Sequence, residues 1–312
     1  MLYRDIDSYK VSSLCFGTAT FVAGKLRPEL NSEIGISSLK RSLALGVNLV
    51  HSNSNLGTQW AIKRVLEAVA NSHLNIRHLI KIETPVGENL DLNRFFSEKV
   101  REALRNLGTG FILGIIHEID VKRTSDKSQL SDPKSLTTLF RQTRDVFEHL
   151  KDMGSVGLLI GMAHNPLHMR FAIDSNVYDG LASYYNLFDN WATYFFEELH
   201  YKEKAFIGIR PLKHGLLTER CLGSPDSSYE REYEVLYRLR QRGIGNEPLH
   251  HFAVRFALAH PVVKSIIVGM SCPEHVDELI DAARNPLPFD TFQEVIFEYR
   301  KLQIVNQRRK TQ

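Results

Sequence analysis

The chain has 312 residues, of which 43% are hydrophobic and 24% are charged, and its formal net charge is +3 at pH 7. This composition is typical of a globular protein, and so small a net charge gives no support for nucleic acid as a partner. No apolar run approaches the roughly 18 residues that a membrane-spanning helix needs, so we expect no membrane as a partner either.

Short apolar runs alternate with longer amphipathic segments along the whole chain. Eight runs are predicted strands: Leu14–Gly17, Asn48–Val50, Leu79–Ile82, Phe111–Ile116, Val156–Gly161, Gly180–Tyr184, Ala205–Ile209 and Ser265–Val268. The alternation is typical of repeated strand–helix units. It predicts the α/β class and a (β/α)8 TIM barrel, formed as one domain by residues 1–312. A doubly wound open sheet is the alternative, but no G-x-G-x-x-G follows the first strand.

Amphipathic segments between these runs predict the helices of the barrel. They are Ser32–Leu45, Trp60–Ala70, Leu92–Leu107, Leu136–Met153 and Tyr229–Arg242. The polar segment Lys122–Lys134 follows the fourth strand, and we expect it to be a mobile loop on the face of a barrel where active sites lie. The basic residues at about 300–312 are expected to form a frayed tail.

Several segments match the motifs of one enzyme family. Ile207–Thr218 reads IGIRPLKHGLLT and is similar to a buried strand followed by S/R-P-L-x-x-G-L-L-T. Further matching segments are Tyr3–Arg4, Val11–Thr18, Gly46–Val50, Ala253–Pro261, Ile266–Gly269 and Cys272–His275. In this order, from residue 3 to about residue 285, the chain resembles the aldo/keto reductase family. The resemblance implies a (β/α)8 barrel of aldo/keto reductase type.

The resemblance also implies a reaction, in which a nicotinamide gives hydride to a carbonyl and a tyrosine gives the proton. In the family, a lysine and an aspartate tune the tyrosine, and a histidine orients the substrate. Here His51 stands at the aspartate position, Leu56 at the tyrosine position and Glu83 at the lysine position, whereas His117 matches the histidine. Leucine cannot donate a proton, so the usual proton donor is replaced.

Three readings of these replacements remain open. His51, Glu83 and His117 are expected to end three neighbouring strands and face one pocket, where they provide acid/base groups near neutral pH. The same set resembles a two-histidine, one-carboxylate metal site, although we predict no metal. The third reading is a degenerate site. Lys81 shares strand parity with Glu83 and can also point inward.

The family's cofactor positions are altered as well. The serine and asparagine that hold the nicotinamide carboxamide align with Ala163 and His164, and Asn165 replaces them only with a register shift. The glutamine on the next strand aligns with Ala182, and the stacking tyrosine is expected at Tyr185 or at Tyr184.

The phosphate-binding positions lie after the last two strands. The resemblance implies that Arg210, Leu212 and Lys213 contact the pyrophosphate. Arginine binds a phosphate through two donors, whereas lysine binds it as a single charge. In the turn that holds the 2′-phosphate, Gly269 is retained, whereas Ser271 replaces the arginine and His275 the glutamine. Leu279 replaces the adenine-contacting asparagine. We therefore expect NADP or NAD as the cofactor, or none. The lost contacts should weaken the binding of NADP.

The leading expectation is a divergent oxidoreductase that acts on a small polar carbonyl or alcohol with histidine acid/base groups. The alternatives are a non-redox isomerase, epimerase or lyase on the same barrel, and a non-catalytic relative that binds a ligand or a partner protein. The three scattered cysteines Cys15, Cys221 and Cys272 form no C-x-x-C pair, and residues 1–5 do not begin a signal peptide. Both observations favour a reducing cytoplasm. The oligomeric state is left open.

Overall fold

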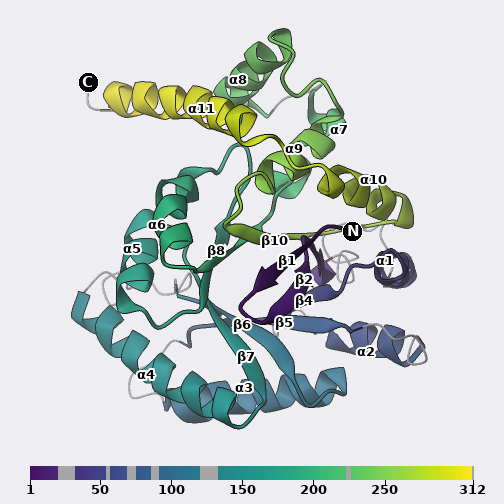
Figure 1. Ribbon diagram of the computed structural model, residues 1–312, viewed down its shortest axis with the longest axis vertical. Coiled ribbons are helices and arrows are strands. Elements are labelled where there is room, and N and C mark those ends of the chain that lie inside the picture. The colour runs from purple at the N-terminus through teal and green to yellow at the C-terminus, as the bar shows by residue number, and fades with distance from the viewer. Residues whose placement is uncertain are drawn as a thin grey trace.

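Eight parallel strands close into a barrel in the computed structural model, which describes residues 1–19, 32–53, 57–68, 75–85, 91–119, 133–222 and 226–310 (Figure 1). The strands are β3 (Leu14–Gly17), β4 (Leu49–Asn53), β5 (Arg77–Glu83), β6 (Ile112–Glu118), β7 (Val156–Met162), β8 (Gly180–Tyr184), β9 (Ala205–Ile209) and β10 (Val263–Val268). The barrel closes where Cys15 of β3 pairs with Ile267 of β10. The predicted (β/α)8 barrel is therefore confirmed.

Helices surround the barrel wall and bury its outer face. They are α1 (Ser32–Ala44), α2 (Gln59–Ala68), α3 (Leu92–Leu107), α4 (Pro133–Asp152), α5 (Pro166–Ser175), α6 (Phe196–Tyr201), α9 (Leu249–Ala257) and α10 (Pro273–Arg284). Apolar side chains form one cluster between the wall and the helices and a second cluster inside the barrel. Both faces of the strands are buried, which explains why their sequences are nearly continuous apolar runs.

A short antiparallel hairpin closes the amino-terminal end of the barrel (Figure 1). Its strands are β1 (Tyr3–Ile6) and β2 (Tyr9–Ser12), joined by a two-residue turn in which Asp7 has a φ of 51°. Aspartate tolerates this left-handed conformation better than most residues. Ile6 and Val11 of the hairpin pack with the interior cluster. The hairpin therefore plugs the end of the barrel that lies opposite the carboxyl ends of the strands.

Additional helices lie together at one side of the barrel, at the top of Figure 1. They are α7 (Glu219–Leu222), α8 (Glu230–Gln241) and α11 (Phe289–Lys310). Single-turn helices are η3 (Trp191–Phe195), η4 (Lys213–Gly215) and η5 (Ser227–Tyr229). The basic segment expected as a tail continues the backbone of α11 to Lys310. No helix within the described ranges is long and apolar enough to cross a bilayer.

Candidate active site

Polar side chains from successive strands gather at the carboxyl end of the barrel, the end at which barrel enzymes place their active sites. Leu49 and Leu79 belong to the interior cluster, and residues two positions apart on a strand share a face. His51 of β4 and Lys81 and Glu83 of β5 therefore project inward. The register places His51 beside Leu79 and Glu83 beside Glu118 of β6.

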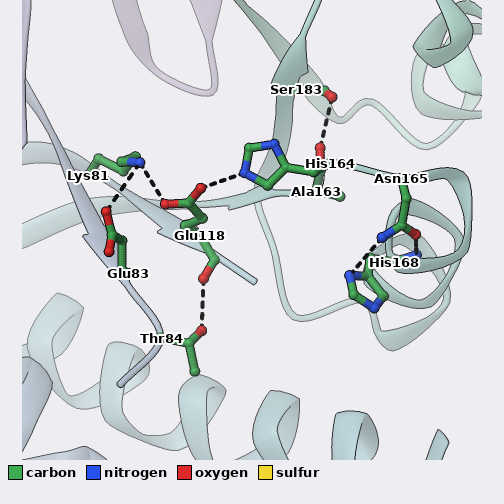
Figure 2. Close-up of polar contacts among 9 residues, drawn as sticks. All are labelled: Lys81, Glu83, Thr84, Glu118, Ala163, His164, Asn165, His168 and Ser183. Atoms are coloured by element: carbon green, nitrogen blue, oxygen red, sulfur yellow. Dashed lines mark hydrogen bonds and ion pairs between the residues drawn. The ribbon is translucent and has the colours of Figure 1, made fainter. Parts of the chain in front are cut away.

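Glu118 is the centre of this group (Figure 2). Its side chain is only 2% exposed, yet both carboxylate oxygens are bound. Oε2 accepts a hydrogen bond from Lys81 Nζ at 2.6 Å, and Oε1 lies 2.5 Å from His164 Nε2, just after β7. A buried carboxylate requires such partners because burial without them costs several kcal/mol. Glu118 is therefore held in place as a charged or proton-sharing group.

Lys81 connects Glu118 to Glu83. Its Nζ lies 3.6 Å from Glu83 Oε1 in addition to its contact with Glu118, and the Glu83 side chain is 40% exposed. The sum of charges over the two carboxylates and the ammonium is −1. The contact between His164 Nε2 and Glu118 Oε1 joins this charged group to the segment after β7.

His51 lies within this group but remains neutral. Burial, helped by the positive charge of Lys81, lowers the pKa of His51 to about 3. Its Nε2 is enclosed and has no hydrogen-bond partner among the residues described. At neutral pH, His51 can therefore accept or donate a hydrogen bond, but it does not act as an imidazolium acid.

His117 does not face this pocket, so the expectation that His51, Glu83 and His117 share one pocket is wrong for His117. Its ring lies outside the barrel wall, edge-on to Phe96 of α3 at 5.2 Å between centroids. Nδ1 lies 2.9 Å from Tyr178 Oη, and Nε2 lies 2.8 Å from Thr84 Oγ1. Because the faces of a strand alternate, β6 directs His117 outward and Glu118 inward.

The outward position also changes the chemistry of His117. The ring is completely buried, and burial lowers its pKa to about 3, even though the neighbouring Glu118 opposes this shift. Thr84 Oγ1 donates to the carbonyl oxygen of Glu118 at 2.8 Å. The neutral imidazole of His117 therefore belongs to a buried network that fixes the end of β6.

The loop after β9 carries two cations in different surroundings. Lys213 Nζ forms an ion pair with Asp189 and lies 5.0 Å from the centroid of the Tyr229 ring. The Arg210 guanidinium instead stacks on Tyr184, with Cζ 3.9 Å from the ring centroid. Leu212 packs against the outer cluster of apolar side chains.

A pocket of about 710 Å³ lies over the carboxyl ends of β9 and β10. Its lining residues come from the loops after both strands and from α7, α9 and α10: Leu212, His214, Gly215, Thr218, Glu219, Arg220, Cys221, His250, Gly269, His275, Glu278 and Leu279. Ser271 Oγ lies 2.9 Å from His275 Nδ1 at the edge of this region. This volume is within the range of small-molecule and cofactor sites.

Comparisons with known proteins place this arrangement in a family. The model of the Aldo/keto reductase family matches residues 13–296, which is most of the chain. The chain belongs to the aldo/keto reductase family. Comparison with the curated proteins gave no match.

Solved aldo-keto reductase structures have the same fold. Aldo-keto reductase AKR11C1 from Bacillus halodurans, in its holo form, has a TM-score of 0.74 at 20% identity, and the match covers 95% of this chain and 96% of that one. The glycerol dehydrogenase AKR11B4 from Gluconobacter oxydans has a TM-score of 0.71 at 16% identity, with 95% of this chain and 93% of that one covered. At these identities the likeness concerns the fold.

The residues expected at the family's nicotinamide positions make other contacts in this structure. Ala163 offers no polar side chain, and His164 contacts Glu118. Asn165 caps α5 by accepting a hydrogen bond from the backbone N–H of His168 at 2.9 Å, so it does not replace the carboxamide ligand (Figure 2). Ser183 Oγ donates to the carbonyl oxygen of Ala163 at 2.8 Å.

Of the two tyrosines expected at the stacking position, Tyr184 faces the barrel interior and Tyr185 does not. Tyr185 is fully buried between the barrel wall and the helices, where its ring contacts Phe196, Phe206 and Phe256. Tyr184 packs against the interior cluster and lies beside the His164 ring, with centroids 4.7 Å apart. Successive residues of a strand point to opposite faces, so Tyr184 faces the barrel interior and Tyr185 faces the helices.

Some positions singled out in the sequence lie outside the described residues. Leu56, which the resemblance aligns with the family tyrosine, is among them, and so is most of Lys122–Lys134. Asn53 of β4 pairs with Lys81 of β5 and belongs to the same end of the barrel. Within the described part of the chain, no group of three or more histidine, cysteine, aspartate and glutamate side chains is arranged to hold a metal ion.

Proposed function

We propose that this aldo/keto reductase is an oxidoreductase of small polar carbonyls or alcohols, in which Glu118, His164 and Lys81 replace the family's acid/base residues. The observation that supports this most directly is the buried Glu118 held between Lys81 Nζ and His164 Nε2. Buried acid/base groups that share a proton at the mouth of a barrel are typical of catalytic sites.

A nicotinamide dinucleotide fits part of the structure. The pocket over β9 and β10 has room for its adenosine end, with Gly269, His275 and Leu279 in its lining. When bound, the nicotinamide supplies or accepts the hydride. The side chain of Ala163 cannot hold the carboxamide, so the cofactor's firmest contacts are expected at the adenosine end and not at the nicotinamide end.

The chain's own residues then handle the proton. The proton between His164 Nε2 and Glu118 Oε1 passes to the carbonyl oxygen while the carbonyl carbon gains the hydride, which gives the alcohol. His164 is the member of the pair that reaches the mouth, with 13% of its side chain exposed. Lys81 stabilises the charge left on Glu118, and alcohol oxidation follows the same steps in reverse.

The substrate class follows from the polar lining. Lys81, Glu83, His51 and Glu118 offer hydrogen-bond donors and acceptors and little apolar surface at the mouth. The structurally similar glycerol dehydrogenase acts, by its name, on a small polyol, which supports a substrate of this kind. Cys15, Cys221 and Cys272 are all free, which supports a reducing, cytoplasmic location.

Glu118→Gln tests the proposal. Glutamine keeps the shape of the side chain but cannot share the proton with His164, so we expect kcat with NADH or NADPH to fall by about 10²- to 10⁴-fold. Glu98→Gln makes the same chemical change on the exposed surface of α3, where Glu98 pairs with Arg94, and should leave kcat unchanged. Initial rates over a panel of polyols and hydroxy-aldehydes provide the measurement.

His117→Ala distinguishes the two faces of β6. Because His117 is buried outside the barrel wall, its loss should lower the thermal midpoint by several degrees. Full turnover in Glu118→Gln, or loss of turnover in His117→Ala at an unchanged midpoint, would contradict the assignment of Glu118.

A further inference from the structure

The backbone around Arg210 is held in a conformation that non-glycine residues rarely adopt. Arg210 has a φ of 61°, and Lys213 and His214 in the same loop also have positive φ. Asn186 Nδ2 donates to the carbonyl oxygen of Arg210 at 3.1 Å, and Asn186 is itself fully buried. Left-handed backbone at a non-glycine residue is strained and persists where the surroundings enforce it. The fold therefore fixes where the Arg210 side chain begins.

The side chain is also oriented. Its guanidinium stacks on the face of Tyr184, and the Tyr184 ring also lies beside the His164 ring, 4.7 Å away between centroids. His164 in turn contacts Glu118. Arg210 thus lies one aromatic ring away from the pair to which we assign the proton transfer.

The charge of Arg210 is not neutralised within the described part of the chain. The neighbouring Lys213 is paired with Asp189, whereas the Arg210 guanidinium has no ion pair or hydrogen bond to a described residue. Stacking occupies the face of the guanidinium and leaves the N–H groups at its edge free for a planar anion. These donors are suited to a carboxylate or a phosphate.

The position of Arg210 favours the substrate over the cofactor. The family resemblance assigns this residue to the pyrophosphate, but Arg210 is absent from the lining of the pocket that fits the adenosine end, to which Leu212, His214 and Gly215 contribute. Its stacking partner Tyr184 packs instead against the interior of the barrel. The free N–H groups of Arg210 therefore lie at the carboxyl end of the barrel, on the side of Glu118 and His164.

We propose that Arg210 binds an anionic group of the substrate, so that the preferred substrate is a small hydroxy or carbonyl compound carrying a carboxylate or a phosphate. This inference rests on the proposed function for the redox step. The anionic group takes no part in that step and serves to orient the carbon that exchanges hydride. Tyr184 keeps the guanidinium in place without competing for its N–H groups.

Three matched polyols test the proposal: glycerol, glycerate and glycerol 3-phosphate. We expect kcat/KM for one of the two anions to exceed that for glycerol by about 10- to 100-fold, the value of a charged hydrogen-bonded contact. Arg210→Ala should lower kcat/KM for the preferred anion to about the level of glycerol, and Arg210→Lys should restore part of the preference. The anion that is preferred distinguishes carboxylate from phosphate. Arg238→Ala, an exposed arginine on α8 paired with Glu234, is the matched control.

Calorimetry separates this inference from the proposed function. Titration of wild type and Arg210→Ala with glycerate, glycerol 3-phosphate and inorganic phosphate needs no turnover. Anion binding that is lost in Arg210→Ala supports the inference even if no redox activity is found. Equal anion binding by both proteins, no anion binding by wild type, or a selective loss of NADH affinity in Arg210→Ala would overturn it.

Discussion

At the scale of single residues, burial decides which histidines can exchange protons. His51 and His117 each have a pKa lowered to about 3, with burial as the main cause. Neither is an imidazolium at neutral pH. His164, which contacts the buried Glu118, is the histidine placed to share one. The chemistry of this site is therefore set by the partners of each imidazole more than by the number of histidines.

The low pKa of His51 predicts how stability depends on pH. Its ordinary value is 6.5 and its value in the folded protein is about 3, so the unfolded chain takes up this proton first as the pH falls. The stabilising contribution of neutral His51 is complete above pH 6.5 and declines between pH 6.5 and 3. Well below pH 6.5, the free energy of unfolding falls by about 1.4 kcal/mol for each pH unit.

His51→Gln should remove this contribution. Between pH 7.5 and pH 5.0, the free energy of unfolding of wild type should fall by about 1–2 kcal/mol more than that of the variant. Urea denaturation at the two pH values provides the measurement. His78 and His117 are present in both proteins, so the difference isolates His51. Equal losses in both proteins would show that His51 is protonated in the folded state.

At the scale of elements, the sequence located the strands well but not the faces of every strand. The predicted ranges Leu14–Gly17, Gly180–Tyr184 and Ala205–Ile209 coincide with β3, β8 and β9. A strand buried on both faces has no polar alternation, so its sequence does not show which residues point inward. His117 is selected by its match to the family's histidine, and the apolar run before it does not show that its neighbour Glu118 is the residue that faces the interior.

Other parts of the site were partly visible in the sequence. Parity correctly paired Lys81 with Glu83 on one face of β5. The contact between Glu118 and His164 joins residues 46 positions apart, and no local pattern reports such a contact. The available signal was Glu118 itself, an acidic residue at the end of an apolar run. A carboxylate buried there needs a partner.

The lining of the pocket over β9 and β10 predicts which dinucleotide binds more tightly. Ser271, which the resemblance aligns with the family's phosphate-binding arginine, contacts His275, while Glu219 and Glu278 contribute carboxylates to the lining. A 2′-phosphate would meet these carboxylates, and Ser271 offers it one hydrogen bond where an arginine would offer two. We expect NADH to bind at least about 10-fold more tightly than NADPH.

Ser271→Arg should then raise the affinity for NADPH by about 10-fold and change that for NADH little. Dissociation constants from NAD(P)H fluorescence titration give the comparison, and Ser228→Arg, on the exposed turn before α8, controls for added charge. Tighter binding of NADPH than NADH by wild type would show that the 2′-phosphate has a partner elsewhere.

At the scale of the whole molecule, the stabilising hairpin and the candidate site lie at opposite ends of the barrel. The hairpin of β1 and β2 covers the amino-terminal end, whereas Glu118 and its partners lie at the carboxyl end. Arg4 of β1 fastens the hairpin by donating to the carbonyl oxygens of Leu258 at 2.6 Å and His260 at 3.3 Å, and also to that of Val263. One side chain thus joins the first strand to the segment that leads into β10.

Arg4→Ala should therefore lower stability without changing catalysis. Loss of the charged hydrogen bonds to buried carbonyl groups should reduce the free energy of unfolding by about 2–4 kcal/mol, while KM and kcat stay within about 2-fold of wild type. Arg41→Ala is the matched control, because its ion pair with Asp277 is about half exposed on both sides and should contribute less than about 1 kcal/mol. Denaturant melts and initial rates on the same preparations test both expectations. A large rise in KM in Arg4→Ala at unchanged stability would mean that the hairpin communicates with the mouth of the barrel, and the separation of the two ends would then be wrong.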